Sequence, residues 1–150
     1  MAKYQQGFFK PLHPEKYKGK KDIVFRSGWE RNFMLWADQH KDVIRWSSEE
    51  VILQYRHPVT NRLHRYFPDF WIEKLDRNGN LETLLIEIKP LAQCKPPVLK
   101  NCKNGKPRKN QVHQIITYGV NQAKWKAAQA YCDKMKWKFQ VLTEKDLNLL

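Results

Sequence analysis

The sequence predicts an α/β domain in which a mixed central sheet is flanked by helices. Three observations support this fold class. A helix signal comes first, strand patterns follow it, and a second helical stretch precedes a last strand. The chain has 150 residues of which 41% are hydrophobic, which is enough for one core. We therefore expect a single domain over residues 27–150, preceded by a basic, extended N-terminal arm over residues 1–26.

Short sequence patterns predict the helix and the strands in the first half of the domain. Ser27 is followed three residues later by Glu30, and this capping box predicts a helix from Ser27 to about His40. Two strands are predicted in VIRW and EEVILQYRH, and the turn residues HPVTNR follow them. The runs LHRYFPDFWIEKL and LETLLIEIK, separated by DRNGN, are typical of a hairpin.

The second half begins with a segment rich in Lys, Pro and Asn, which predicts a basic loop over about residues 90–110. Apolar residues at helical spacing predict a second helix over about residues 111–134, with a break near Gly119. The run WKFQVL predicts a last strand, and TEKDLNLL predicts a short capped helix. The order of elements therefore fits one sheet with helices beside it.

The register of the predicted hairpin follows from its turn. The sequence RNG at residues 77–79 fits a three-residue loop with glycine in the left-handed region. Counting outward from this loop pairs apolar residues on one face: Ile72 with Leu84 and Phe70 with Ile86. On the other face Asp69 lies opposite Glu87, and Lys89 follows on that same face. A bulge at Pro68 would shift this register by one residue.

Two opposed carboxylates, with Cβ atoms about 4.5–5.5 Å apart, repel each other unless a proton or a cation lies between them. Their oxygens are the hard ligands that Mg²⁺ prefers, and Lys89 adds a positive charge beside them. Glu30 completes the acidic set if it points inward with Phe33 of the first helix. The capping box alone also accounts for Glu30.

The charge of the chain indicates a polyanionic partner. There are 28 Lys and Arg residues against 15 Asp and Glu, a formal net charge of +13. No apolar run approaches the roughly 18 residues of a membrane-spanning helix. Because the sequence between residues 88 and 132 contains no Asp or Glu, we expect its basic residues to contact DNA phosphates. The predicted DNA-binding residues are Lys95, Lys100, Lys103, Lys106, Arg108 and Lys109.

The motifs PDF at residues 68–70 and EIK at residues 87–89 resemble those of the PD-(D/E)xK nuclease superfamily. Together with FRSGWE around Glu30, they are most similar to the transposase-A-like endonucleases. By length and layout the chain resembles the head-completion nucleases of T-even phages. The resemblance implies a restriction-endonuclease-like core and Mg²⁺-dependent hydrolysis of DNA, with Mn²⁺ as a substitute. It assigns catalysis to Glu30, Asp69, Glu87 and Lys89, of which Asp69 and Glu87 bind the metal.

The same resemblance implies double-stranded or branched DNA, or DNA ends, as the substrate, and phage head or portal proteins as partners. It places the protein in the cytoplasm of an infected bacterium or in the virion. The N-terminal sequence lacks the apolar region of a secretory signal, so we expect neither secretion nor a membrane partner. The residues leave two functions open: an endonuclease, or a non-catalytic DNA-binding structural protein of capsid completion. The acidic and lysine positions favour the enzyme. Whether two chains form a dimer stays open.

Overall fold

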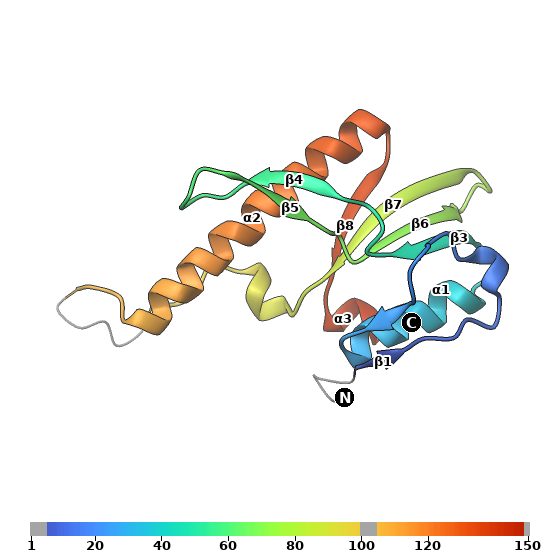
Figure 1. Ribbon diagram of the computed structural model, residues 1–150, viewed down its shortest axis with the longest axis horizontal. Coiled ribbons are helices and arrows are strands. Elements are labelled where there is room, and N and C mark those ends of the chain that lie inside the picture. The colour runs from blue at the N-terminus through green and yellow to red at the C-terminus, as the bar shows by residue number, and fades with distance from the viewer. Residues whose placement is uncertain (1–5, 100–104, 149–150) are drawn as a thin grey trace.

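The computed structural model describes residues 6–99 and 105–148 (Figure 1). Its elements, in chain order, are β1 (Gly7–Phe8), η1 (Pro14–Lys16), β2 (Val24–Phe25), α1 (Gly28–Gln39), β3 (Val43–Ser48), β4 (Leu53–Arg56), β5 (Leu63–Tyr66), β6 (Phe70–Leu75), β7 (Leu81–Ile88), η2 (Leu91–Cys94), α2 (Lys109–Met135), β8 (Lys138–Leu142) and α3 (Glu144–Leu147).

The main sheet has the strand order β3-β6-β7-β8. β3 and β7 both run antiparallel to β6, and β8 runs parallel to β7. The parallel pair requires a crossover connection, which the long helix α2 provides. α1 and α2 lie on different sides of the sheet (Figure 1). The predicted fold class, a mixed sheet flanked by helices in a restriction-endonuclease-like core, is confirmed.

The β6–β7 hairpin has the predicted register. Gly79 adopts a φ of 79°, in the left-handed region that a residue without a Cβ occupies at little cost. The Asp76 N–H donates to the Asn80 carbonyl at 2.8 Å, which closes the three-residue loop. The predicted apolar pairs are present: Phe70 with Ile86 and Ile72 with Leu84. Pro68 lies before β6 begins, so no bulge shifts this register.

Side chains from the two faces of the sheet enter two different cores. Phe70, Ile72 and Ile86 pack with Phe33 and Met34 of α1. On the other face the core contains a second set of buried or half-buried side chains: Trp71 and Leu85 of the sheet with Ala128 and Cys132 of α2. Because side chains alternate along a strand, Glu87 lies on the same face of β7 as Leu85, which is the face toward α2.

A second hairpin, formed by β4 and β5, covers part of α2 (Figure 1). Leu53, Tyr55 and Tyr66 are its buried residues, and they belong to the same core as α2. The expected break near Gly119 is wrong, since α2 continues from residue 109 to residue 135. One glycine costs a helix about 1 kcal/mol, which a long packed helix tolerates. None of the helices in the described residues is long and apolar enough to cross a membrane.

Residues 12–16 pack against the C-terminal end of α1. Asp38, which is 1% exposed, accepts hydrogen bonds from the Leu12 N–H at 2.8 Å and the His13 N–H at 3.0 Å. The Lys16 ammonium donates to the carbonyls of Asp38 and His40, each at 2.9 Å. These are carbonyls at the C-terminal end of α1, where a cation is favourable. The segment is therefore fixed to α1 by polar contacts at one end of that helix.

Candidate active site

Two acidic residues converge where β6 begins and β7 ends. Asp69 comes just before β6, and Glu87 is the next-to-last residue of β7. The pairing of Phe70 with Ile86 brings these acids together. The Ile88 N–H donates to Asp69 Oδ2 at 2.7 Å, and the two carboxyl groups lie within hydrogen-bonding contact of each other. The structure thus places the two residues side by side, as counting from the turn predicts.

Burial dominates the electrostatics of this pair. Burial raises the pKa of Asp69 well above its usual range, and the charge of Glu87 raises it further. Glu87 is 6% exposed, and burial raises its pKa against the opposing hydrogen bond from Tyr66 and the charge of Lys89. The raised pKa values favour a proton shared between the two carboxyl groups, and a cation between them would favour ionisation of both.

The donor set fits a hard divalent cation. Mg²⁺ is commonly bound by one or two carboxylates, with water and phosphate oxygens as its other ligands. In residues 6–99 and 105–148 no three His, Cys, Asp or Glu side chains form one cluster. The Asp69 and Glu87 carboxylates would hold such a cation, and its charge would add to the positive charges of Lys89 and Lys124 near the pair.

Lys89 directly follows β7. Its N–H donates to the Leu142 carbonyl of β8 at 2.9 Å, so its backbone is held by the sheet. Its side chain is half-buried, and its positive charge acts to lower the pKa of both Asp69 and Glu87. The structure therefore brings Lys89 to the carboxylate pair, where its ammonium group can interact with a negatively charged substrate.

Two further residues, which the sequence analysis does not single out, also lie at the pair. The Tyr66 hydroxyl of β5 donates a hydrogen bond to the Glu87 carboxylate. The Lys124 ammonium of α2 lies 5.5 Å from the centroid of the Tyr66 ring and 5.7 Å from that of Tyr55. Burial lowers the pKa of Lys124, while the charge of Glu87 raises it. The site is therefore assembled from the sheet, the β4–β5 hairpin and α2.

Ser27 caps α1 as predicted, but the Glu30 carboxylate does not complete the capping box, because it accepts from residue 26 instead of Ser27. The Glu30 N–H donates to the Ser27 hydroxyl at 3.1 Å, and the Glu30 carboxylate accepts the Arg26 N–H at 3.0 Å. The Arg26 guanidinium in turn forms an ion pair with Glu49, another acid that the sequence analysis does not single out. Burial raises the pKa of Glu30 to about 7, and the negative charge of Asp69 contributes. Glu30 therefore lies in the first turn of α1, close enough to the pair to interact electrostatically with it.

We expect Glu30→Gln to weaken the pH dependence of stability. With a pKa raised from 4.5 to about 7, Glu30 binds its proton more tightly in the folded state than in the unfolded state. The linked stability is present below about pH 4.5 and is lost as the pH rises through 7. Gln still accepts the Arg26 N–H but does not ionise, so the metal-free Tm should fall less over this window.

Thermal unfolding at a series of pH values measures this difference. Glu15→Gln, which removes an exposed carboxylate, is the matched control. If the Tm of Glu30→Gln falls with pH as steeply as that of the wild type, Glu30 does not carry the raised pKa.

The predicted DNA-binding residues follow the site along the chain. Four of them are described by the structure and are exposed: Lys95, Lys106, Arg108 and Lys109. The other two, Lys100 and Lys103, lie outside the described residues. The Arg108 N–H donates to the Gln111 side chain at 2.7 Å, so the basic segment leads directly into the first turn of α2.

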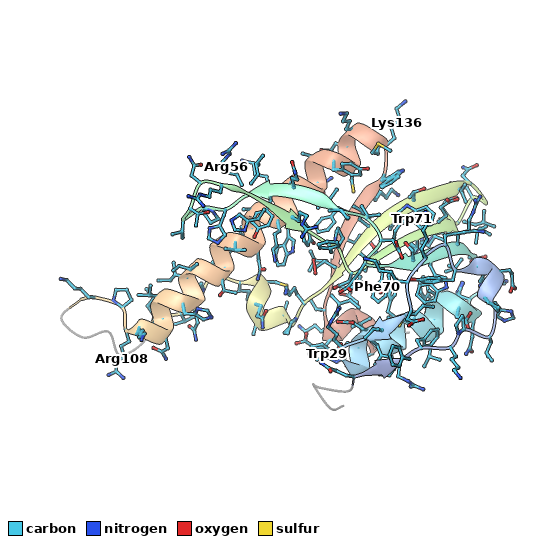
Figure 2. All side chains as sticks on the ribbon, viewed as in Figure 1. Trp29, Arg56, Phe70, Trp71, Arg108 and Lys136 are labelled. Atoms are coloured by element: carbon cyan, nitrogen blue, oxygen red, sulfur yellow. The ribbon has the colours of Figure 1, made fainter. Side chains whose placement is uncertain are left out.

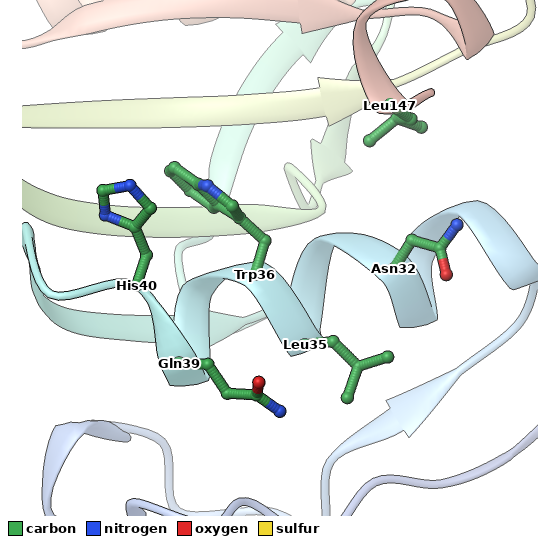
Figure 3. Close-up of a pocket in the computed structure, with 6 residues that line it drawn as sticks. All are labelled: Asn32, Leu35, Trp36, Gln39, His40 and Leu147. Carbon is green, nitrogen blue, oxygen red and sulfur yellow. The ribbon is translucent and has the colours of Figure 1, made fainter. Parts of the chain in front are cut away.

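Two hollows elsewhere in the described structure contain no residue of the carboxylate pair in their linings. One, of about 650 Å³, separates residues 92–98 from α2. The other, of about 470 Å³, lies on α1, where Trp36 and His40 extend from one side of the helix and Leu35 and Gln39 from the other (Figure 3). No Asp or Glu lines either hollow, so neither offers a carboxylate to a metal.

Comparison with known proteins gives two matches. Residues 40–144 match the family model described as TnsA-like endonuclease N terminal. The chain is also 37% identical over 145 residues to the head completion nuclease of Enterobacteria phage T4, covering 96% of this chain and 94% of that protein. The matched region includes Asp69, Glu87 and Lys89. The chain belongs to the TnsA-like endonuclease family.

Proposed function

We propose that this protein is a Mg²⁺-dependent endodeoxyribonuclease that acts on phage DNA during head completion. The observation that carries the proposal is the pairing of the half-buried Asp69 with the buried Glu87 beside Lys89 at the end of β7. A protein that only bound DNA would gain nothing from two opposed carboxylates facing phosphate. The name of the T4 relative supports nuclease action in head completion. Phage DNA, phage head or portal proteins and the infected cell are the corresponding substrate, partners and location.

The chain's own groups have distinct roles in the proposed reaction. A bound Mg²⁺ supplies positive charge to the phosphate and lowers the pKa of water. The Lys89 ammonium orients the attacking water and stabilises the negative charge that develops on the phosphate. Tyr66 fixes the orientation of the Glu87 carboxylate through its hydroxyl. Lys124 adds a second positive charge from α2, which lies over the Tyr55 and Tyr66 rings and interacts electrostatically with Glu87.

A plasmid assay tests this function. Supercoiled plasmid, linear DNA and a branched duplex are incubated with the protein and Mg²⁺, with Mn²⁺, or with a chelator. We expect nicking or linearisation of at least one substrate with either metal and none with the chelator. Binding to DNA without cutting of any substrate would refute the enzyme and support a non-catalytic DNA-binding protein of capsid completion.

We expect Tyr66→Phe to reduce cleavage by about 10–100-fold, the usual effect of losing a hydrogen bond to a metal ligand. The phenylalanine ring keeps the buried packing and the face beneath Lys124. It loses only the hydroxyl that holds Glu87. The loss should appear as a higher Mg²⁺ concentration at half-maximal rate, measured at saturating DNA.

Tyr131→Phe on α2 is the control, since that ring packs on Trp137. Wild-type rates and an unchanged Mg²⁺ requirement in Tyr66→Phe would show that the hydroxyl does not position Glu87.

A further inference from the structure

The β4–β5 hairpin has an unusual charge composition. Residues 51–68 contain three arginines and two histidines but no Asp or Glu. This run lies before the acid-free segment that follows the carboxylates, and it belongs to a different element of the fold. A two-stranded ribbon needs no excess of one charge for its stability, so the composition indicates a role for the charge itself.

The register of the β4–β5 hairpin places the arginines of its strands on the face opposite the one that packs on α2. Leu53 pairs with Tyr66, and these residues pack toward α2. The intervening pairs are Gln54 with Arg65 and Arg56 with Leu63, and all four of these side chains are exposed. Because side chains alternate along each strand, Arg56 and Arg65 share the outward face. Figure 2 shows Arg56 at the outer edge of this hairpin, away from Phe70.

Two of the arginines are held in place by their surroundings. The Arg56 guanidinium donates to the Asn61 carbonyl of the turn at 2.8 Å. The Arg65 guanidinium lies 5.8 Å from the centroid of the Phe67 ring. The turn itself is fixed, since the Nδ1 atom of His57 accepts the Val59 N–H at 3.1 Å. Supported guanidinium groups lose less conformational freedom on binding phosphate than mobile lysines do.

The hairpin has a defined position relative to the carboxylate pair. Tyr66, at the end of β5, donates to Glu87, so this end of the strand is fixed at the site. Arg62 comes four residues earlier in the chain, which at ~3.3 Å per residue is about 13 Å away. Phosphates of one DNA strand follow each other at ~3.4 Å along the helix axis. Arg65 is thus adjacent to Tyr66, whereas Arg62 and Arg56, which pairs with Leu63, lie about four nucleotides of axial length from it.

We infer that Arg56 and Arg65 on the outward face of the β4–β5 hairpin, together with the exposed Arg62 just before β5, bind the phosphate backbone of the DNA substrate beside the cleaved bond. This inference rests on the proposed nuclease function and adds a second contact surface to the basic segment before α2. The contacts are to phosphate, so they increase affinity without selecting a base sequence.

The test compares two double variants that each remove two positive charges. Arg62→Gln with Arg65→Gln changes the hairpin and leaves the Arg56–Asn61 hydrogen bond in place. Lys41→Gln with Arg77→Gln is the control. Lys41 lies before β3 and Arg77 in the β6–β7 turn, both exposed and at the end of the sheet opposite the carboxylates. Thermal unfolding verifies that both variants are folded, and DNA binding is measured at several salt concentrations with a 30-base-pair duplex.

For the hairpin variant we expect weaker DNA binding. The slope of log K against the logarithm of the salt concentration should be smaller in magnitude by about 1.8, which is 0.9 for each lost phosphate contact. The cleavage rate of the hairpin variant at saturating DNA should stay near that of the wild type, with the loss in kcat/KM. The control should keep the wild-type slope. If the hairpin variant and the control variant have equal salt slopes and equal affinities for DNA, the inference about the hairpin is wrong. In that case the proposed nuclease function still stands if the wild type cleaves DNA. A wild type that neither binds nor cuts DNA overturns both proposals.

Discussion

Asp69→Asn should abolish DNA cleavage and, in the absence of metal, make the protein more stable at neutral pH. Metal stabilisation of charge in a transition state is worth several kcal/mol, and each 1.36 kcal/mol is tenfold in rate. Removing one of two carboxylate ligands should therefore reduce the rate by about 10³-fold or more. The assay is plasmid nicking with Mg²⁺ under single-turnover conditions, so that product release does not limit the rate.

The stability gain follows from the raised pKa of Asp69, which burial and the charge of Glu87 both cause. A group with a raised pKa in the folded state stabilises that state below its unfolded pKa, and the contribution is lost as the pH rises. Asn does not ionise, its oxygen still accepts the Ile88 N–H, and its amide donates to Glu87. At about pH 8 we expect a Tm higher by about 2–4 °C for each kcal/mol gained.

The difference in Tm between Asp69→Asn and the wild type should shrink toward about pH 4, and saturating Mg²⁺ should reverse it by stabilising only the wild type. Asp133→Asn, on the exposed side of α2, makes the same chemical change elsewhere. A cleaving Asp69→Asn protein, or one less stable than the wild type at both pH values, is incompatible with a metal-binding carboxylate pair.

Lys89→Met should lose about 10²–10³-fold in the rate of the chemical step, the usual cost of removing one group that stabilises charge in a transition state. Met keeps the unbranched side chain and the N–H that donates to Leu142, so the sheet is preserved. The Mg²⁺ requirement and the affinity for DNA should change little. Single-turnover cleavage, with DNA binding measured in Ca²⁺, separates these quantities.

Two further variants make the Lys89 result specific. Lys41→Met removes an exposed charge far along the sheet and should cut at the wild-type rate. Lys89→Arg keeps a positive charge but replaces a compact ammonium with a planar guanidinium, so it should restore only part of the rate. If the whole loss in Lys89→Met is in DNA affinity, the lysine binds substrate without taking part in the reaction.

The sequence is sufficient to predict the carboxylate pair because the information is local. A glycine at residue 79 fixes the turn, the turn fixes the register, and the register places Asp69 beside Glu87. The first helix is likewise predictable, since the Ser27 hydroxyl caps it by accepting the Glu30 N–H within four residues. In both cases the physical constraint lies inside a short stretch of chain.

Tyr66 and Lys124 could not be found in this way. Their places depend on how the β4–β5 hairpin packs on α2, which involves contacts between residues distant in sequence. The run LHRYFPDFWIEKL reads as one strand, whereas the structure divides it around Pro68 into β5 and β6. The sequence does carry one indication of the hairpin. Apolar and polar residues alternate in LQYR, and this pattern gives β4 one buried face and one exposed face.

The position of β7 determines how the site responds to partial opening of the fold. β7 is hydrogen-bonded to β6 on one side and to β8 on the other, and it carries Glu87. Amides on such a strand typically exchange with solvent only through global unfolding. The β4–β5 hairpin is a two-stranded ribbon, so its local opening costs less. On warming, Tyr66 would therefore release Glu87 before the strand itself opened, and cleavage would fall below the temperature of global unfolding.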